Sequence, residues 1–105
     1  MGTKMKYQLV IQFVGESEDD FDHLIQLEDE LEELLSDESE VDGHDFGSGE
    51  MNIFILTNEP NGTFEQVKAA LTKKDLSTMK AAYRDIESEV FSILWPKNLT
   101  EFVVT

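Results

Sequence analysis

The 105-residue sequence contains no cysteine, and this absence removes several kinds of chemistry at once. Disulfide bonds, zinc sites built on thiolates and catalysis by a thiol nucleophile are all excluded. Long apolar runs are missing as well, since no stretch approaches the roughly 20 apolar residues of a membrane-spanning helix. The first residues also lack the apolar centre of a signal peptide. We therefore expect a cytoplasmic protein that folds without disulfide bonds.

Positive charge is absent from more than half of the chain. Between Tyr7 and Val67 there is no lysine or arginine, whereas this stretch holds 18 of the 23 acidic residues. From Lys68 onward the two signs nearly balance, and the net charge of the whole chain is −15. Such an acidic lobe repels phosphate groups, so we expect no binding to nucleic acid or to anionic membranes.

The partners that an acidic lobe attracts are cations and basic proteins, because charge complementarity raises association rates. Solubility alone is the simpler explanation of the same composition. Mimicry of nucleic acid is a further alternative, which requires carboxylates spaced like phosphates. The sequence leaves all three open.

Length and composition indicate a single α+β domain spanning residues 1–105. A chain of this size hides roughly 65% of its unfolded surface on folding, which is enough for one core. Neither a linker nor an internal repeat interrupts it. We expect residues 1–5 to lie outside the folded part, with Met5 as an alternative natural start.

Hydrophobic periodicity predicts the elements of this domain. Ser17 and Asp20 form a weak capping box at the start of an amphipathic helix, and Thr63 with Gln66 suggests a second one. The expected elements are a strand over residues 7–14, a helix after Ser17, strands over 40–46 and 51–56, a helix after Thr63, strands over 79–84 and 89–95, and an edge segment at 102–104. Residues 76–95 also satisfy a helical period, but the β-prone run at their end favours two strands.

This order predicts a ferredoxin-like, split β-α-β fold, a two-layer sandwich in which an antiparallel sheet with an extra strand carries two helices on one face. The other face has some apolar character. It is therefore expected to meet solvent, a ligand, the C-terminal segment or a second copy of the chain in a homodimer.

The glycine-rich stretch from Val41 to Ile55 is the most distinctive part of the sequence. It places Asp42, His44, Asp45 and Glu50 around a predicted hairpin. Oxygen donors favour magnesium, calcium or manganese, and imidazole favours later metals. Because side chains alternate along a strand, at most two of the four converge unless a bulge intervenes. We therefore favour a polar turn and expect neither a metal nor a cofactor.

Glu28 breaks the apolar stripe of the first helix, whereas His23 lies at the margin of the stripe as a solvated flank residue. A carboxylate that faces a sheet needs a partner, because burying it alone costs several kcal/mol. The candidates are His44, Tyr83, Arg84 and backbone N–H groups of the hairpin. Glu28 and His44 are suited to general acid–base catalysis, but a buried structural network is the favoured interpretation.

Three segments together resemble a small bacterial family of uncharacterised proteins of about this length. They are Val41–Phe54, which contains a VDGHDFGSGExNIF-type motif, Ala82–Asp85 and Leu94–Pro96. The resemblance covers the chain from about Lys6 onward. It implies a stand-alone bacterial cytoplasmic domain, and it supplies no catalytic residues.

Two hypotheses of function follow. The first is an acidic interaction module that presents its first helix and hairpin to a basic protein, and the second is a small enzyme or a ligand- or metal-binding domain with a pocket at Glu28 and His44. The first predicts that Glu28 is tied down and that the acids of the helix point outward. The second predicts a concave pocket where Glu28 and His44 meet. We favour the first.

Overall fold

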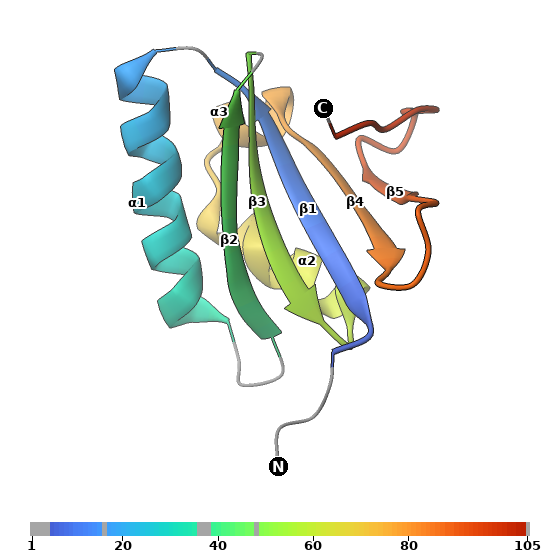
Figure 1. Ribbon diagram of the computed structural model, residues 1–105. Helices are drawn as coiled ribbons and strands as arrows, with labels where there is room; N and C mark the ends of the chain where they lie inside the picture. Colours follow the sequence, from blue (N-terminus) through green and yellow to red (C-terminus); the bar gives the residue numbers. More distant parts are fainter. Residues whose placement is uncertain (1–4, 16, 36–38, 48, 105) are drawn as a thin grey trace.

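The computed structural model describes residues 5–15, 17–35, 39–47 and 49–104. Residues 1–4 of the expected N-terminal extension lie outside the described residues. The elements in order are β1 (Tyr7–Val14), α1 (Glu18–Leu34), β2 (Ser39–Gly47), β3 (Glu50–Thr57), α2 (Pro60–Ala70), α3 (Lys73–Thr78), β4 (Lys80–Asp85) and β5 (Ser92–Trp95). The five strands form one antiparallel sheet in the order β2-β3-β1-β4-β5 (Figure 1). The predicted α+β class with an antiparallel sheet is confirmed.

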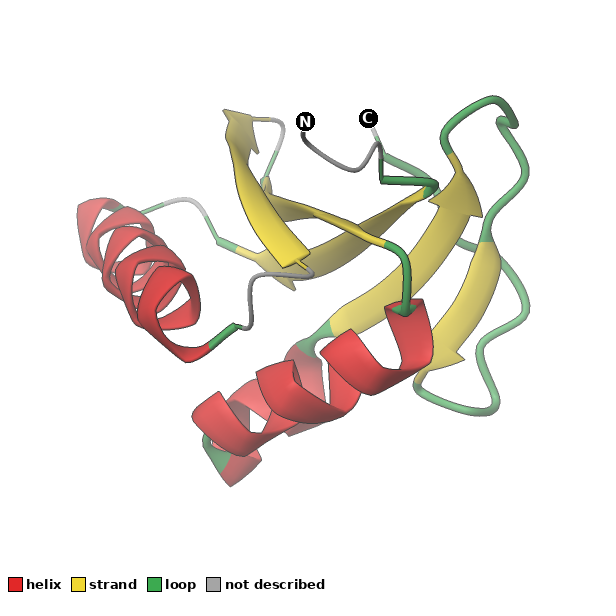
Figure 2. Cartoon of the chain, turned by 90° about the horizontal axis from the view of Figure 1, so that it is seen from below, coloured by secondary structure: helices red, strands yellow, loops and turns green. Residues whose placement is uncertain are grey.

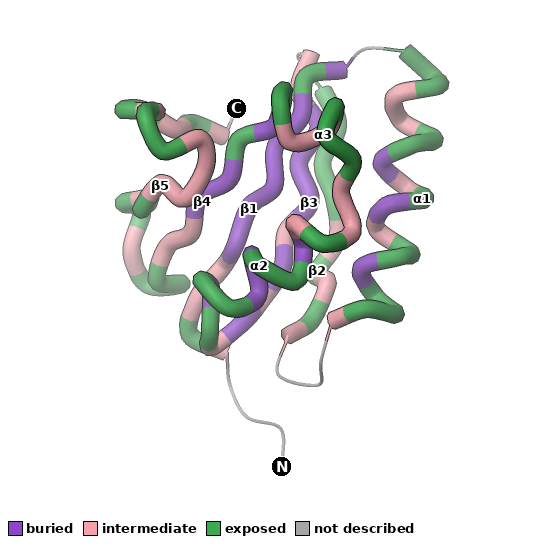
Figure 3. Tube along the Cα trace, turned by 180° about the vertical axis from the view of Figure 1, so that it is seen from behind, coloured by how far each residue is buried: buried purple, intermediate pink, exposed green. Residues whose placement is uncertain are grey.

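The helices gather on one side of the sheet, and the C-terminal segment lies on the other (Figure 2). The core between α1, α2 and the sheet consists of Leu9, Ile11, Phe13, Leu24, Leu27, Leu31, Met51, Ile53, Ile55, Phe64, Val67, Met79 and Ala81. Burying a large apolar side chain contributes roughly 1.5–3 kcal/mol. Buried residues accordingly concentrate on the central strands β1 and β3 (Figure 3).

The start of α1 is fixed by the predicted capping box. The Asp20 backbone N–H donates to the Ser17 hydroxyl at 3.1 Å, and the Ser17 N–H donates to the Asp20 carboxylate at 3.3 Å. Both bonds satisfy donors that a helix leaves unpaired at its first turn. The buried leucines 24, 27 and 31 then face the sheet.

The predicted start of the second helix was wrong. α2 begins at Pro60 after an N-cap at Glu59, because proline lacks an N–H and is well tolerated in the first turn. Thr63 is buried inside the helix, where its hydroxyl lies 2.8 Å from that of Thr57 and 2.9 Å from that of Ser39. The short helix α3, capped by Thr72 and Asp75, was not predicted.

The second face of the sheet is partly covered by the end of the chain. β4 confirms the strand predicted over 79–84, whereas the strand predicted over 89–95 is present only as β5 at Ser92–Trp95, and residues 102–104 form no strand. The amide of Gln12 donates to the Val103 carbonyl at 2.9 Å and to Asn52 Oδ1 at 3.1 Å, and the rings of Phe91 and Phe102 lie 5.0 Å apart. The C-terminal segment is therefore one of the expected covers of this face.

Across the described residues, no helix combines the length and the apolarity that crossing a membrane requires.

Candidate functional site

A β-bulge in β2 determines which residues of the glycine-rich stretch face the helices. Val41 is paired with Ile55 and His44 with Ile53, and the register shifts between Val41 and Gly43. Residues three apart on a regular strand point to opposite faces, but the extra residue of the bulge places Val41 and His44 on the same face. Gly43 has a φ of 134°, a conformation that residues with a side chain rarely adopt.

The structure brings Glu28 and His44 together between α1 and β2. His44 Nδ1 lies 3.0 Å from Glu28 Oε2 and 3.2 Å from Oε1. The Glu28 side chain is only 13% exposed, and that of His44 is 31% exposed. The ring of Phe21 meets the imidazole edge-on at 5.7 Å between centroids. The pair therefore ties α1 to β2, and any catalytic role for it stays a prediction.

Tyr83 and Arg84 do not join this pair, so the predicted four-residue network was wrong for these two. β4 is separated from β2 by β3 and β1. Tyr83 packs edge-on against Tyr7 at 5.7 Å. Arg84 is paired with Gln8 in the register and donates to its Oε1 at 3.0 Å, which places the guanidinium on the other face of the sheet.

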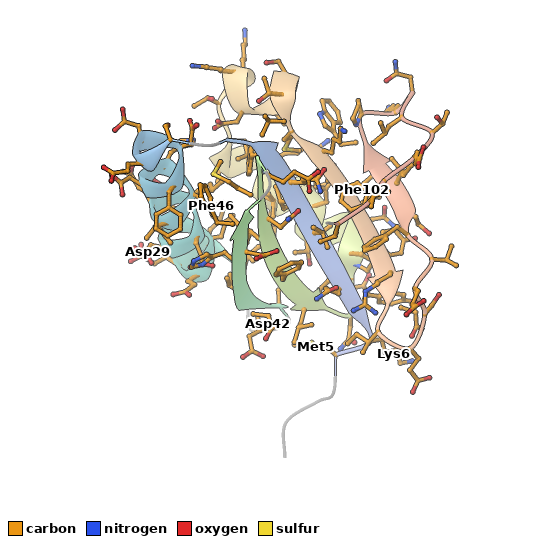
Figure 4. All side chains as sticks on the ribbon, turned by 45° about the horizontal axis from the view of Figure 1, so that its top comes forward. Met5, Lys6, Asp29, Asp42, Phe46 and Phe102 are labelled. Carbon is orange, nitrogen blue, oxygen red and sulfur yellow. The ribbon has the colours of Figure 1, made fainter. Side chains whose placement is uncertain are left out.

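The remaining candidates do not converge with His44. Asp45 is paired with Asn52 and so points to the second face, where Glu50 Oε1 accepts from the Gln12 amide at 3.4 Å. Asp42 lies in the bulge and is exposed near one end of β2 (Figure 4). Considering the described residues alone, no group of three or more histidine, aspartate or glutamate side chains is arranged to hold a metal ion.

A second histidine–carboxylate pair was missed from the sequence. His23 Nε2 lies 3.1 Å from Asp75 Oδ1, and the Thr72 backbone N–H donates to Asp75 Oδ2 at 3.1 Å. Burial raises the pKa of Asp75, but the bonds from the Thr72 backbone, the His23 ring and the Thr72 hydroxyl outweigh it and hold the pKa below its usual value. The spacing of Thr72 and Asp75 is a capping-box signal that could have indicated α3.

This pair lines a pocket of about 400 Å³ between α1, α3 and the ends of β1 and β3. Its floor is apolar, with Phe13 and Met51, and its rim carries charges of both signs, including Asp20 and Lys74. A second pocket of about 410 Å³ lies between α1 and the end of β2. The lining of neither pocket includes Glu28 or His44.

The outer side of α1 is densely acidic. Its exposed acidic residues, hereafter the acidic face, are Glu18, Asp19, Asp22, Asp29, Glu30, Glu32 and Glu33. At 100° per residue they occupy an arc of about 160°, opposite the buried leucines. Asp29 lies on this outer side in Figure 4. The helix contains no lysine or arginine, so nothing within it neutralises the acidic face.

No family model, curated protein or solved structure matches this chain. The resemblance to a small bacterial family therefore stays a prediction. The functional proposal rests on the residues of the chain itself.

Proposed function

We propose that this chain is an interaction module that binds a basic protein through the acidic face of α1. The observation that carries the proposal is the uneven placement of charge on this helix. Seven of the ten exposed residues of α1 are acidic, the other three being His23, Gln26 and Leu34. Glu28, the carboxylate within the apolar stripe, is bonded to His44. Solubility alone requires negative charge but does not require it on one helix. Concentrated charge of one sign accelerates encounter with a partner of opposite sign.

We further propose that the domain is of the ferredoxin-like type and acts in the cytoplasm. The order β1-α1-β2-β3-α2-β4 and the strand order β2-β3-β1-β4 support the fold assignment. In this arrangement α1 and α2 lie on the same face, so the outer side of α1 is available to a partner.

The alternative of a small enzyme or ligand-binding domain at Glu28 and His44 has less support. Each side chain of the pair bonds to the other, and both pockets described above are lined by different residues. A reacting group would have to displace one member of the pair.

The test is the affinity of the full chain for a fluorescent arginine-rich peptide, measured by anisotropy. The variant Asp29→Asn/Glu32→Gln/Glu33→Gln removes three charges from the acidic face. The matched control Glu87→Gln/Glu89→Gln/Glu101→Gln removes three exposed charges from the C-terminal part. We expect the first variant to bind roughly tenfold more weakly and to lose part of the salt dependence, because rim charges each contribute a fraction of a kcal/mol. Equal weakening by both variants would show that only total charge matters.

A further inference from the structure

The pocket between α1 and the end of β2 has aromatic walls and an acidic rim. It is lined by Ser17, Glu18, Phe21, Asp22 and Phe46 and has a volume of about 410 Å³. The rings of Phe21 and Phe46 meet nearly at right angles, with centroids 5.3 Å apart. Phe46 is 40% exposed, although it lies on the helix-facing side of β2 opposite buried Met51. In Figure 4 its side chain lies between β2 and α1.

The aromatic wall is held in place by the Glu28–His44 pair. His44 is anchored by the Glu28 carboxylate at 3.0 Å, and its ring packs on Phe21 at 5.7 Å. Phe21 in turn packs on Phe46. A partner entering the pocket therefore meets rings that are already ordered, which reduces the entropy lost on binding.

The chemistry of the lining selects a cation. The face of a phenyl ring is the negative end of its quadrupole and attracts ammonium or guanidinium groups. Glu18 and Asp22 are exposed carboxylates at the rim. Of the described residues, none with a positive side chain lines the pocket. An anionic ligand would be repelled here, and a purely apolar one would leave the carboxylates without a role.

We propose that this pocket receives an arginine side chain of the basic partner. The planar guanidinium stacks on a phenylalanine ring while its N–H groups reach a carboxylate, an arrangement that a compact ammonium group matches less well. This inference rests on the proposed function. It adds that one arginine of the partner binds in a defined pocket at the edge of the acidic surface.

The test is a titration of the full ¹⁵N-labelled chain with the short blocked peptide Gly-Arg-Gly, followed by NMR. The matched control is the same peptide with citrulline, which has the shape of arginine without its charge. We expect saturable shifts centred on Ser17, Glu18, Phe21, Asp22 and Phe46 with arginine and none with citrulline. Shifts of equal size with citrulline, or shifts spread evenly along α1, would refute the proposal that this pocket binds arginine.

Variants separate the pocket from the general field of the helix. Phe46→Leu keeps the charge but removes one ring, and we expect it to weaken arginine-peptide binding about two- to fivefold, as cation–π contacts at exposed sites do. Glu18→Gln/Asp22→Asn should weaken binding more than Asp29→Asn/Glu32→Gln, which makes the same charge change elsewhere on α1.

Failure of this inference is distinguishable from failure of the proposed function. If Phe46→Leu has no effect and both charge variants weaken binding equally, the arginine pocket is refuted while the acidic face still binds. If the arginine-rich peptide does not bind at all, both are refuted. Circular dichroism spectra of the variants verify that each retains its fold.

Discussion

Glu28 shows how one polar residue in an apolar stripe can organise its surroundings. It lies among the side chains by which α1 packs on the sheet, where its side chain is only 13% exposed and its carboxylate is bonded to His44. A carboxylate in this position without a partner would be costly. The hydrogen bond to His44 joins α1 to β2, and the His44 ring also contacts Phe21 of the aromatic wall.

His44→Ala should therefore destabilise the protein by about 1–2 kcal/mol, because it leaves Glu28 largely buried without its partner. The double variant Glu28→Leu/His44→Ala should recover most of this loss, since a leucine there extends the apolar stripe. The free energy of unfolding in urea measures both. If the double variant is no more stable than His44→Ala, lost packing of the imidazole rather than the unpaired carboxylate accounts for the effect.

Asp75, in the other histidine–carboxylate pair, should make the free energy of unfolding depend on pH. Its pKa in the folded protein lies below the ordinary value near 3.8, because the bonds from Thr72 and His23 outweigh the effect of burial. A depressed folded pKa contributes stability that is present above the unfolded pKa and lost as the pH falls through the folded one.

The variant Asp75→Asn should accordingly be less stable than the unmodified chain at neutral pH, by about 1 kcal/mol. The difference should begin to shrink as the pH falls below the ordinary value of 3.8, and it should be lost as the pH passes through the lower pKa of the folded carboxyl. Urea unfolding at a series of pH values measures it. A difference that stays constant down to low pH would contradict the assignment of the ionised carboxylate as the acceptor.

At the scale of elements, the bulge in β2 is the feature that positions the site. Gly43 has a positive φ of 134° and an open space where a side chain would be. Gly47 has equally open surroundings, and its φ does not lie in that region. An added side chain would clash at neither position, so comparing the two isolates the effect of backbone strain.

Gly43→Ala should cost about 1–2 kcal/mol through backbone strain and weaken the contact between His44 and Glu28. Gly47→Ala should change the free energy of unfolding by less than about 0.5 kcal/mol. Urea unfolding of both variants makes the comparison, and NMR follows the His44 ring. Equal costs at the two positions would refute the special role of the bulge.

Elements whose signals are local were predictable from the sequence. The apolar strand β1 and the capping box of α1 depend on neighbours within a few residues, and both are present in the structure. Thr63 was wrongly predicted to cap the second helix. Its hydroxyl instead bonds to Thr57 and Ser39 on two strands, and the helix begins at Pro60. Strand register also depends on distant partners.

The candidate site was predictable only in part, for the same reason. The position of Glu28 in the stripe indicated a partner, and His44 was among the candidates. A bulge places His44 on the helix-facing side of β2, and the only sign of this bulge in the sequence is Gly43. Tyr83 and Arg84 lie away from the pair, because β3 and β1 separate β4 from β2.

At the scale of the whole molecule, the acidic face of α1 and the sheet face covered by the C-terminal segment lie on different sides. The second face of the sheet is partly covered by the chain's own C-terminal segment, through Gln12 and Val103. Association of two copies through this face remains a proposal, and it would have to accommodate that segment. The acidic face of α1 lies on the other layer, away from the C-terminal segment (Figures 1 and 2).

The most direct test of the central claim is to map where a basic peptide binds. Backbone amides of the ¹⁵N-labelled chain are followed by NMR during titration with the arginine-rich peptide, at low and then at high salt. The account predicts shifts concentrated on α1 and the end of β2, with β4, β5 and the C-terminal segment unchanged and with the effect reduced by salt. Shifts distributed over all acidic residues, including Glu87 and Glu101, would contradict it.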